Sequence, residues 1–403
     1  MTPPFGGPDG IDGFDQSHGP GGNVPPGAFE ETFGEPLART LDFSTWASGV
    51  QLGGLYGKLE EEISAALTAE EPVRDAIRAV LFQQVGQQPD LPDDAGVFQA
   101  ALDDLALVHR GLLFRGAVEA CNGIAVTHDA LAVSITQVGV CLVSYRAELG
   151  SWVHRLFRRD LRAVTDPVDA AIEVIKGRDL GSQIGGTERL SDLARRGVMA
   201  YAERAALLDG STAPWRLGHG NPVALELLNG SGSMELLEAS LDLLERLLTE
   251  HPRFVFVPSG LNERGLLTLA DALRPLEYAI VDHMTSRMIA VINSSTYESG
   301  FAERARDFAL ARGKDIVIGI YRASAVGPPR IFYAHRDHAH EAALIAMADS
   351  VLHEHCAFPT LLELADAVCR ATFGAGDFTE SVRQAYAGAG QTNAFHEEHG
   401  SRR

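Results

Sequence analysis

The sequence predicts an α/β protein, with a mixed sheet flanked by helices behind a helical region and a disordered tail. Three observations lead to this prediction. Residues 1–36 are rich in Gly, Pro and Asp, residues 37–115 repeat apolar side chains at helical spacing, and residues 116–390 alternate β-branched runs with helical patterns. A chain in which strands alternate with helices builds a sheet that the helices cover.

The first 36 residues contain too few apolar side chains to offset the entropy lost on ordering, so we predict a disordered tail. A second interpretation is a tail that docks on a partner through its spaced aromatic residues, Phe5, Phe14 and Phe29. Residues 391–403 are polar and are predicted as another flexible tail.

Apolar residues with a spacing of four predict two helices, over 59–67 and 73–81. A third helix is predicted over 97–108, where Val, Phe and Leu recur at similar intervals. These three helices either pack on the sheet or form a protruding arm.

After residue 117 the residue pattern becomes typical of β-strands. Residues 123–127 and 137–145 are apolar and β-branched, and they predict a strand pair joined by a loop at His128 and Asp129. A short buried strand is predicted over 203–208, followed by a tight turn at Asp209 and Gly210. The later predicted strands are 254–259, 288–292, 316–321 and 330–333, and the predicted helices are 187–201, 234–248, 266–273, 301–311, 339–353 and 361–372. This order is typical of an RNase H-like mixed sheet.

The formal net charge of −20 excludes a protein that holds nucleic acid over its whole surface, because phosphates would be repelled. A DNA-binding role therefore needs a local basic strip or a basic partner. The four cysteines form no CxxC pair, and Cys121 and Cys141 lie in apolar runs, which predicts buried thiols in a reducing cytoplasm. No signal peptide and no membrane span are expected from the sequence.

Four arginines supply the best basic strip. If residues 152–162 are helical, Arg155, Arg158, Arg159 and Arg162 fall on one face and can follow a phosphate backbone or bind a partner. A solvated helix face is the alternative.

Two acidic residues indicate divalent-metal chemistry. A carboxylate at the end of a buried strand is held rigidly beside an open loop, and Asp209 is predicted to occupy such a position. Glu188, at the start of a predicted helix, is the second candidate, with Asp192 and Glu203 as neighbouring alternatives. A turn-forming Asp before Gly is the alternative interpretation of Asp209.

From about residue 117 to 375 the chain resembles the NurA family, nuclease-fold proteins that work with HerA-type hexameric ATPases on DNA ends. The resemblance rests on an ordered series of segments: Leu207–Ser211 with Trp215, the long helix at 234–249, residues 254–259, Ile280–Asp282, and residues 358–366. It implies an RNase H-like fold, Mn²⁺ or Mg²⁺ as cofactor, a homodimer and a HerA-type partner. Asp209 and Glu188 match acidic positions of the family.

Two positions depart from the family pattern. The first motif aspartate corresponds to Asn122, and a late histidine corresponds to Asp366. An asparagine lacks the negative charge of a metal-binding carboxylate, so cleavage is expected to be weakened or lost. Asp129, just beyond the first strand, is a possible substitute ligand.

Three hypotheses follow: a metal-dependent DNA nuclease, a non-cleaving NurA-like subunit that docks on the ATPase and guides DNA, or an unrelated α/β protein with a coincidental Asp-Gly-Ser. The sequence does not decide among them, nor between DNA repair and antiviral defence. His335, His338, His340, His353, His355 and Cys356 are metal-binding residue types. Their spacings match no known zinc motif, so a polar surface is expected there.

Overall fold

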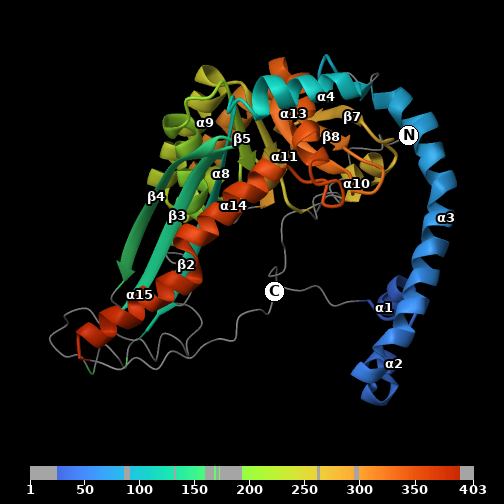
Figure 1. The fold of residues 1–403 in the computed structure, drawn as a ribbon, viewed down its shortest axis with the longest axis horizontal. Helices are drawn as coiled ribbons and strands as arrows, with labels where there is room; N and C mark the ends of the chain where they lie inside the picture. The colour runs from blue at the N-terminus through green and yellow to red at the C-terminus, as the bar shows by residue number, and fades with distance from the viewer. Residues whose placement is uncertain are drawn as a thin grey trace. The chain divides into compact units, whose positions relative to one another are not determined.

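The structure of the protein is a computed structural model (Figure 1). It describes residues 25–85, 91–130, 133–158, 168, 172, 193–260, 264–294 and 299–390. These residues divide into two compact units, one within 1–84 and 262–272 and the other within 85–261 and 273–403. None of the helices in the described ranges combines the length and the apolar composition that a membrane span requires.

The smaller unit is helical. Arg78 in its longest helix, α3, donates a hydrogen bond of 2.7 Å to the carbonyl of Ala272. The sequence predicted two helices where α3 is one, and Pro72 lies inside it. The described elements of this unit are α1 Ala28–Phe33, α2 Leu37–Leu41, the short helices Phe43–Thr45 and Gly49–Gln51, α3 Leu52–Val85 and α10 Arg264–Asp271.

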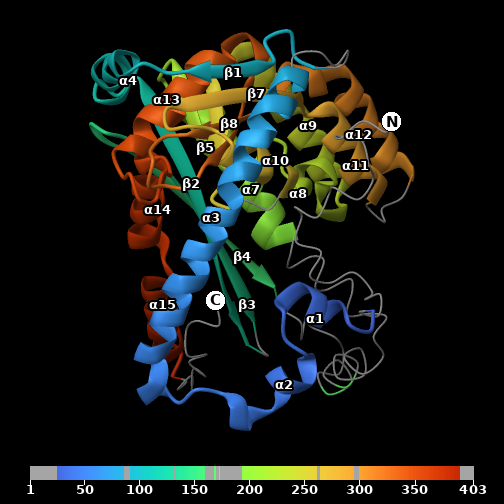
Figure 2. The same cartoon turned by 90° about the vertical axis from the view of Figure 1, so that its right-hand side faces the viewer.

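The larger unit is built on a nine-stranded mixed sheet with the order β1-β7-β8-β9-β6-β5-β2-β3-β4. The two neighbours of β5, β2 and β6, run parallel to it, and the remaining neighbouring pairs are antiparallel, such as β1 with β7 (Figure 2). The strands are β1 Gly96–Gln99, β2 Val118–Asp129, β3 Ser134–Ser144, β4 Ala147–Arg158, β5 Trp215–His219, β6 Phe254–Val257, β7 Glu277–His283, β8 Ile316–Arg322 and β9 Arg330–His335. The predicted α/β class with a mixed sheet is confirmed.

Helices cover both faces of this sheet. The main apolar core joins alternate residues of β2, β5 and β6 to α13 and α14, and α14 runs along β2 and β3 (Figure 1). On the opposite face, the buried Arg216 of β5 donates to the carbonyl of Leu207, which follows α7. The helices of this unit are α4 Leu102–Val108, α7 Val198–Ala205, α8 Leu225–Leu228, α9 Met234–Glu250, α11 Thr285–Ser294, α12 Ser299–Arg312, α13 Ala339–Val351, α14 Thr360–Phe373 and α15 Ala375–Gly388, with short helical turns at His109–Leu113, Leu193–Gly197, Ala206–Gly210, Gly230–Gly232, Gly313–Asp315 and Arg336–His338.

The structure corrects several predicted elements. Residues 96–99 form strand β1 rather than the start of a helix, because they pair with β7. Residues 288–292 lie in helix α11, and residues 203–208 lie in α7 and the π-helical turn after it. Apolar runs this short carry no period that separates strand from helix, so their packing partners decided the outcome. The strand pair before residue 145, the hairpin of β8 and β9, and helices α9, α10, α12, α13 and α14 are confirmed.

A buried carboxylate joins α13 to α14. Asp349 is completely buried; its side chain accepts hydrogen bonds from the Tyr145 hydroxyl and, at 2.9 Å, from the backbone N–H of Leu361. Burial raises the pKa of Asp349 to about 6, against the lowering effect of these hydrogen bonds. The first turn of α14, which leads to the candidate site, is fixed by this carboxylate.

We predict that Tyr145→Phe lowers the free energy of unfolding by about 1–3 kcal/mol, because it removes a donor to a buried carboxylate. Tyr386→Phe is the matched control, since the Tyr386 hydroxyl is buried and has no hydrogen-bond partner within the described residues. Chemical denaturation measures both variants. Equal losses would contradict the role assigned to Tyr145.

The raised pKa of Asp349 also predicts a pH dependence. Between the unfolded value of 3.8 and the folded value of about 6, the native state binds more protons, so stability falls as pH rises through this window. Asp349→Asn should remove this slope in denaturation curves recorded from pH 4 to 7. An unchanged slope in the variant would assign the titration to another group.

Candidate functional site

The candidate site lies where β5 ends beside the longer strand β2. The parallel pairing runs from Val118 opposite Trp215 to Cys121 opposite Gly218. Beyond it, β5 ends at His219 and the chain turns away at Gly220, whose φ is +81°. The carboxyl ends of parallel strands are where α/β proteins gather functional groups.

On the α14 face of the sheet, Asn122 meets Asp366. The Asn122 amide nitrogen donates to one Asp366 oxygen at 3.1 Å, and Arg370 Nε lies 2.8 Å from the other oxygen. Asn122 is buried, and Arg370 sits one turn after Asp366 on α14. The carboxylate thus has a neutral donor on one side and a cation on the other.

His219 belongs to the same face. Burial lowers the pKa of His219, and the positive charge of Arg204 lowers it further, while Asp366 acts in the opposite direction. Its ring meets Phe358 edge to face, with centroids 6.2 Å apart. A lowered pKa keeps this imidazole neutral at pH 7, so it adds no cation to the site.

On the opposite face, Gly123 meets Glu203 of α7. Beyond the end of β5 the Gly123 N–H has no strand partner on that side, and the Glu203 carboxylate accepts its hydrogen bond. A Cβ on residue 123 would lie 2.8 Å from a Glu203 oxygen, so any larger residue would displace this carboxylate. Burial raises the pKa of Glu203, and Arg204 opposes the rise.

Arg204 neutralises this buried carboxylate. Its guanidinium lies 2.5 Å from Glu203 and also donates to the carbonyls of Asn221, at 2.5 Å, and Ala200, at 3.3 Å. It also lies 5.4 Å from the centroid of the Phe256 ring. Arg204 therefore joins α7 to the loop that follows β5, and it fixes the chain around His219.

These residues do not fit a two-ion Mn²⁺ or Mg²⁺ site. Hard divalent cations need several anionic oxygens, and within the described residues the Asn122 face supplies only Asp366, which is paired with Arg370. Glu203 contacts β2 from the other face and is paired with Arg204. Both carboxylates have arginine counter-ions where a metal site needs unbalanced negative charge.

Asp209 does not belong to this group. It lies in the helical turn Ala206–Gly210, before β5, and its carboxylate pairs with Arg246 at 2.7 Å on the exposed surface. Asp209 precedes β5 and His219 is its last residue, so the predicted acid-tipped strand is wrong: the strand ends in a histidine. The alternative interpretation, a surface Asp before a turn, describes Asp209 better.

Asp129 is also separate from Asn122. Both are in β2, where Asp129 is exposed and pairs with Ser134 of β3, instead of lying in the predicted loop. Seven strand residues span about 23 Å, so the two side chains cannot hold one cation.

The predicted helix that would place four arginines on one face is wrong for the two arginines that the structure describes. Arg155 and Arg158 lie on strand β4, and each bonds its cross-strand neighbour on β3: Arg155 to Gln137 at 2.7 Å, and Arg158 to Ser134 at 3.2 Å. Strand residues three apart point to opposite faces. Arg159, Arg162 and Glu188 lie outside the described residues.

The sequence interpretation missed His219 and Arg204 and weighed Glu203 only as a neighbour of Glu188. One signal was available for His219. Residues 218–220 are Gly-His-Gly, which is typical of a strand end followed by a turn, but the strand was predicted to end earlier, at Asp209 of the preceding Asp-Gly-Ser. No pattern marked Glu203 and Arg204, because charged residues on a helix are normally exposed.

Solved structures that are similar to this chain include several of NurA. The NurA nuclease from Sulfolobus solfataricus is 10% identical, with a TM-score of 0.39 over 82% of this chain and 98% of its own. NurA bound to dAMP and manganese is 9% identical, with a TM-score of 0.43 over 83% and 97%. NurA with manganese is 11% identical, with a TM-score of 0.37 over 70% and 96%. No protein-family model and no curated protein sequence matches.

The buried ion pair gives a stability prediction. Arg204→Met should cost about 3–5 kcal/mol, because it leaves the Glu203 carboxylate buried without a counter-ion. This loss should shrink at low pH, where Glu203 becomes protonated. The double variant Glu203→Met/Arg204→Met should recover most of the stability in urea unfolding. A double variant as unstable as the single one would show that packing, rather than charge, holds α7 on β2.

Proposed function

We propose that this chain is a NurA-like, DNA-associated protein that does not cleave DNA through a two-metal site on β2 beside the end of β5. The observation that carries the proposal is the Asn122–Asp366–Arg370 network. It occupies the position on β2 where the sequence resemblance implies a metal-binding aspartate.

The charge balance supports this proposal. Phosphodiester cleavage by divalent metals requires ions that activate water and neutralise charge on the phosphate. On the Asn122 face, one carboxylate is offset by one guanidinium, and Asn122 and His219 add no negative charge. A divalent cation would have to displace Arg370 and would find a single anionic ligand among the residues described.

The second candidate is a metal-dependent nuclease of low activity, in which Glu188 supplies a further carboxylate. The raised pKa of the buried Glu203 favours it to a limited extent, because a buried carboxyl can act in proton transfer. Its ion pair with Arg204 argues against that role.

We further propose that the protein acts as a homodimer on DNA ends through a HerA-type hexameric ATPase. The net charge of −20 makes unaided DNA binding unfavourable. The residues offered as a basic strip do not form one in the described part: Arg155 and Arg158 are tied to β3. A partner with a cationic surface would supply the affinity for DNA that this acidic chain lacks.

Metal binding and cleavage test the proposal. Mn²⁺ is the ion to use, because two of the similar solved structures are described with manganese. The wild-type protein should degrade end-labelled DNA no faster than Asp366→Asn. The variant Asn122→Asp/Arg370→Gln should bind Mn²⁺ at least about tenfold more tightly, as measured by calorimetry, because it adds one negative charge and removes one positive charge.

The control for the lost arginine is Arg383→Gln on α15, which removes a guanidinium paired with the exposed Glu380 and should leave Mn²⁺ affinity unchanged. Mn²⁺-dependent cleavage by the wild type that disappears in Asp366→Asn would refute the non-cleaving role. For the partner, failure to co-purify with a HerA-type ATPase, by wild type and Asp366→Asn alike, would remove the docking proposal.

A further inference from the structure

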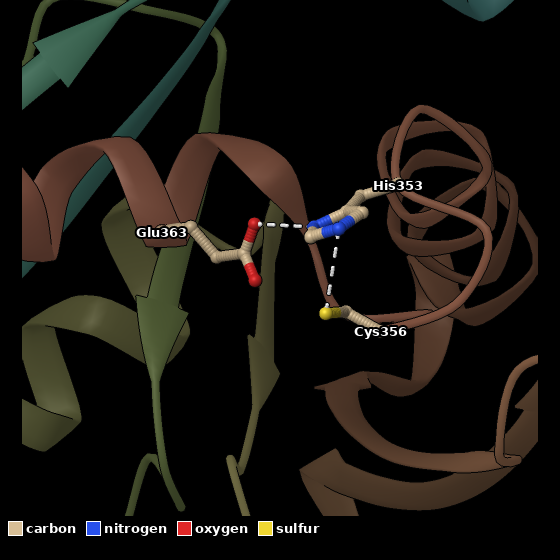
Figure 3. Close-up of side chains that lie close together, drawn as sticks. All are labelled: His353, Cys356 and Glu363. Carbon is tan, nitrogen blue, oxygen red and sulfur yellow. Dashed lines mark hydrogen bonds and ion pairs between the residues drawn. The ribbon is translucent and has the colours of Figure 1, made fainter.

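A thiol, an imidazole and a carboxylate meet in the turn between α13 and α14. Cys356 Sγ lies 3.5 Å from His353 Nε2, and the other ring nitrogen, Nδ1, lies 3.1 Å from a carboxylate oxygen of Glu363 (Figure 3). One possible ligand atom from each residue lies within 4.8 Å of the other two. The imidazole is thus held between a sulfur and an oxygen.

The first distance fits a tetrahedral metal ion. Zinc bonds of about 2.0–2.1 Å to nitrogen and 2.3 Å to sulfur place the two donors about 3.5 Å apart at the tetrahedral angle. The observed separation of Cys356 Sγ and His353 Nε2 is 3.5 Å. The two donors therefore need little movement to share one ion.

The second distance fits the usual support of a metal-binding histidine. Such a histidine donates its remaining N–H to a carboxylate, which fixes the ring and its tautomer. Glu363 provides this carboxylate from the first turn of α14. A proton on Nδ1 leaves the Nε2 lone pair directed at the metal position.

We propose that Cys356 and His353 form a binding site for Zn²⁺ or a similar borderline-soft divalent cation, with Glu363 as the residue that positions His353. Water completes the coordination. On binding, the Cys356 thiol loses its proton to solvent, and the thiolate and the neutral imidazole bond to the metal. Sulfur and nitrogen ligands select zinc over Mn²⁺ or Mg²⁺, so this site is chemically distinct from a nuclease centre.

Hydrogen bonds from residues outside the turn hold its backbone in place. Arg330 donates to the carbonyl of Cys356 at 2.5 Å and to that of Ala357 at 3.2 Å, and it reaches the Ser259 carbonyl at 3.0 Å. Ser324 donates to the carbonyl of Glu354 at 3.0 Å. A turn fixed from outside by these donors loses little entropy when its side chains bind an ion.

The site is accessible to solvent. The side chains of His353 and Glu363 are 49% and 38% exposed. Cys356 is partly exposed, whereas the other three cysteines are buried. The sequence alone predicts an ordinary polar surface here, because the spacing of His353 and Cys356 matches no zinc motif and Glu363 comes from the next helix.

Cobalt spectroscopy on the full-length protein tests the site, since Co²⁺ occupies zinc sites and a thiolate ligand gives a charge-transfer band in the near ultraviolet. Titration with Co²⁺ should produce this band in the wild type, and Zn²⁺ should displace it. Cys356→Ser should abolish the band, and Glu363→Gln should weaken Zn²⁺ binding by about 10–100-fold. His355→Ala is the matched control, an exposed neighbouring histidine outside the cluster, and should change neither result.

A second measurement needs no variant. Zn²⁺ should protect Cys356 of the wild type from iodoacetamide, as read by peptide mass spectrometry. A wild type without the charge-transfer band, or an alkylation rate that Zn²⁺ does not change, would overturn the proposal. Equal losses in Cys356→Ser and His355→Ala would do the same.

Discussion

The parallel pairing of β2 with β5 is the constraint on which the rest of the candidate site depends. It ends at Cys121 and Gly218, while β2 continues for eight more residues in its hairpin with β3. Beyond this point, polar groups of β2 on the β5 side need hydrogen-bond partners other than β5. The Gly123 N–H donates to Glu203 on one face of the sheet, and the Asn122 amide donates to Asp366 on the other.

On both faces of the sheet, a carboxylate is neutralised by an arginine. Each face carries a carboxylate close to the sheet, and each carboxylate is paired with an arginine, Glu203 with Arg204 and Asp366 with Arg370. A buried or half-buried charge without a counter-ion is costly. In a metal-dependent nuclease the cation supplies that compensation; in this chain arginines supply it. Each carboxylate thereby has a counter-ion from the chain itself.

A third carboxylate, Asp349, acts at the N-terminal end of α14, where its partners are a hydroxyl and a backbone N–H and not an arginine. Its buried carboxylate holds the first turn of the helix through the Leu361 N–H, and the same helix then carries Glu363 and Asp366 one turn apart. One rigid helix therefore presents a carboxylate to the His353 ring and another to Asn122. The proposed zinc site and the Asn122–Asp366–Arg370 network share helix α14 but differ in chemistry: sulfur and nitrogen donors at the first, a carboxylate paired with an arginine at the second.

The sequence alone determined the α/β class, the strand pair at 118–144 and the long amphipathic helices, because these segments carry a clear period. It also singled out Asn122 and Asp366, which the structure brings into contact. Only the tertiary structure decided that Asp209 lies on a helical turn paired with Arg246, that His219 ends β5, and that Arg204 is buried. Short apolar runs have no intrinsic preference strong enough to fix their conformation, and a charged side chain is buried only where a distant partner neutralises it.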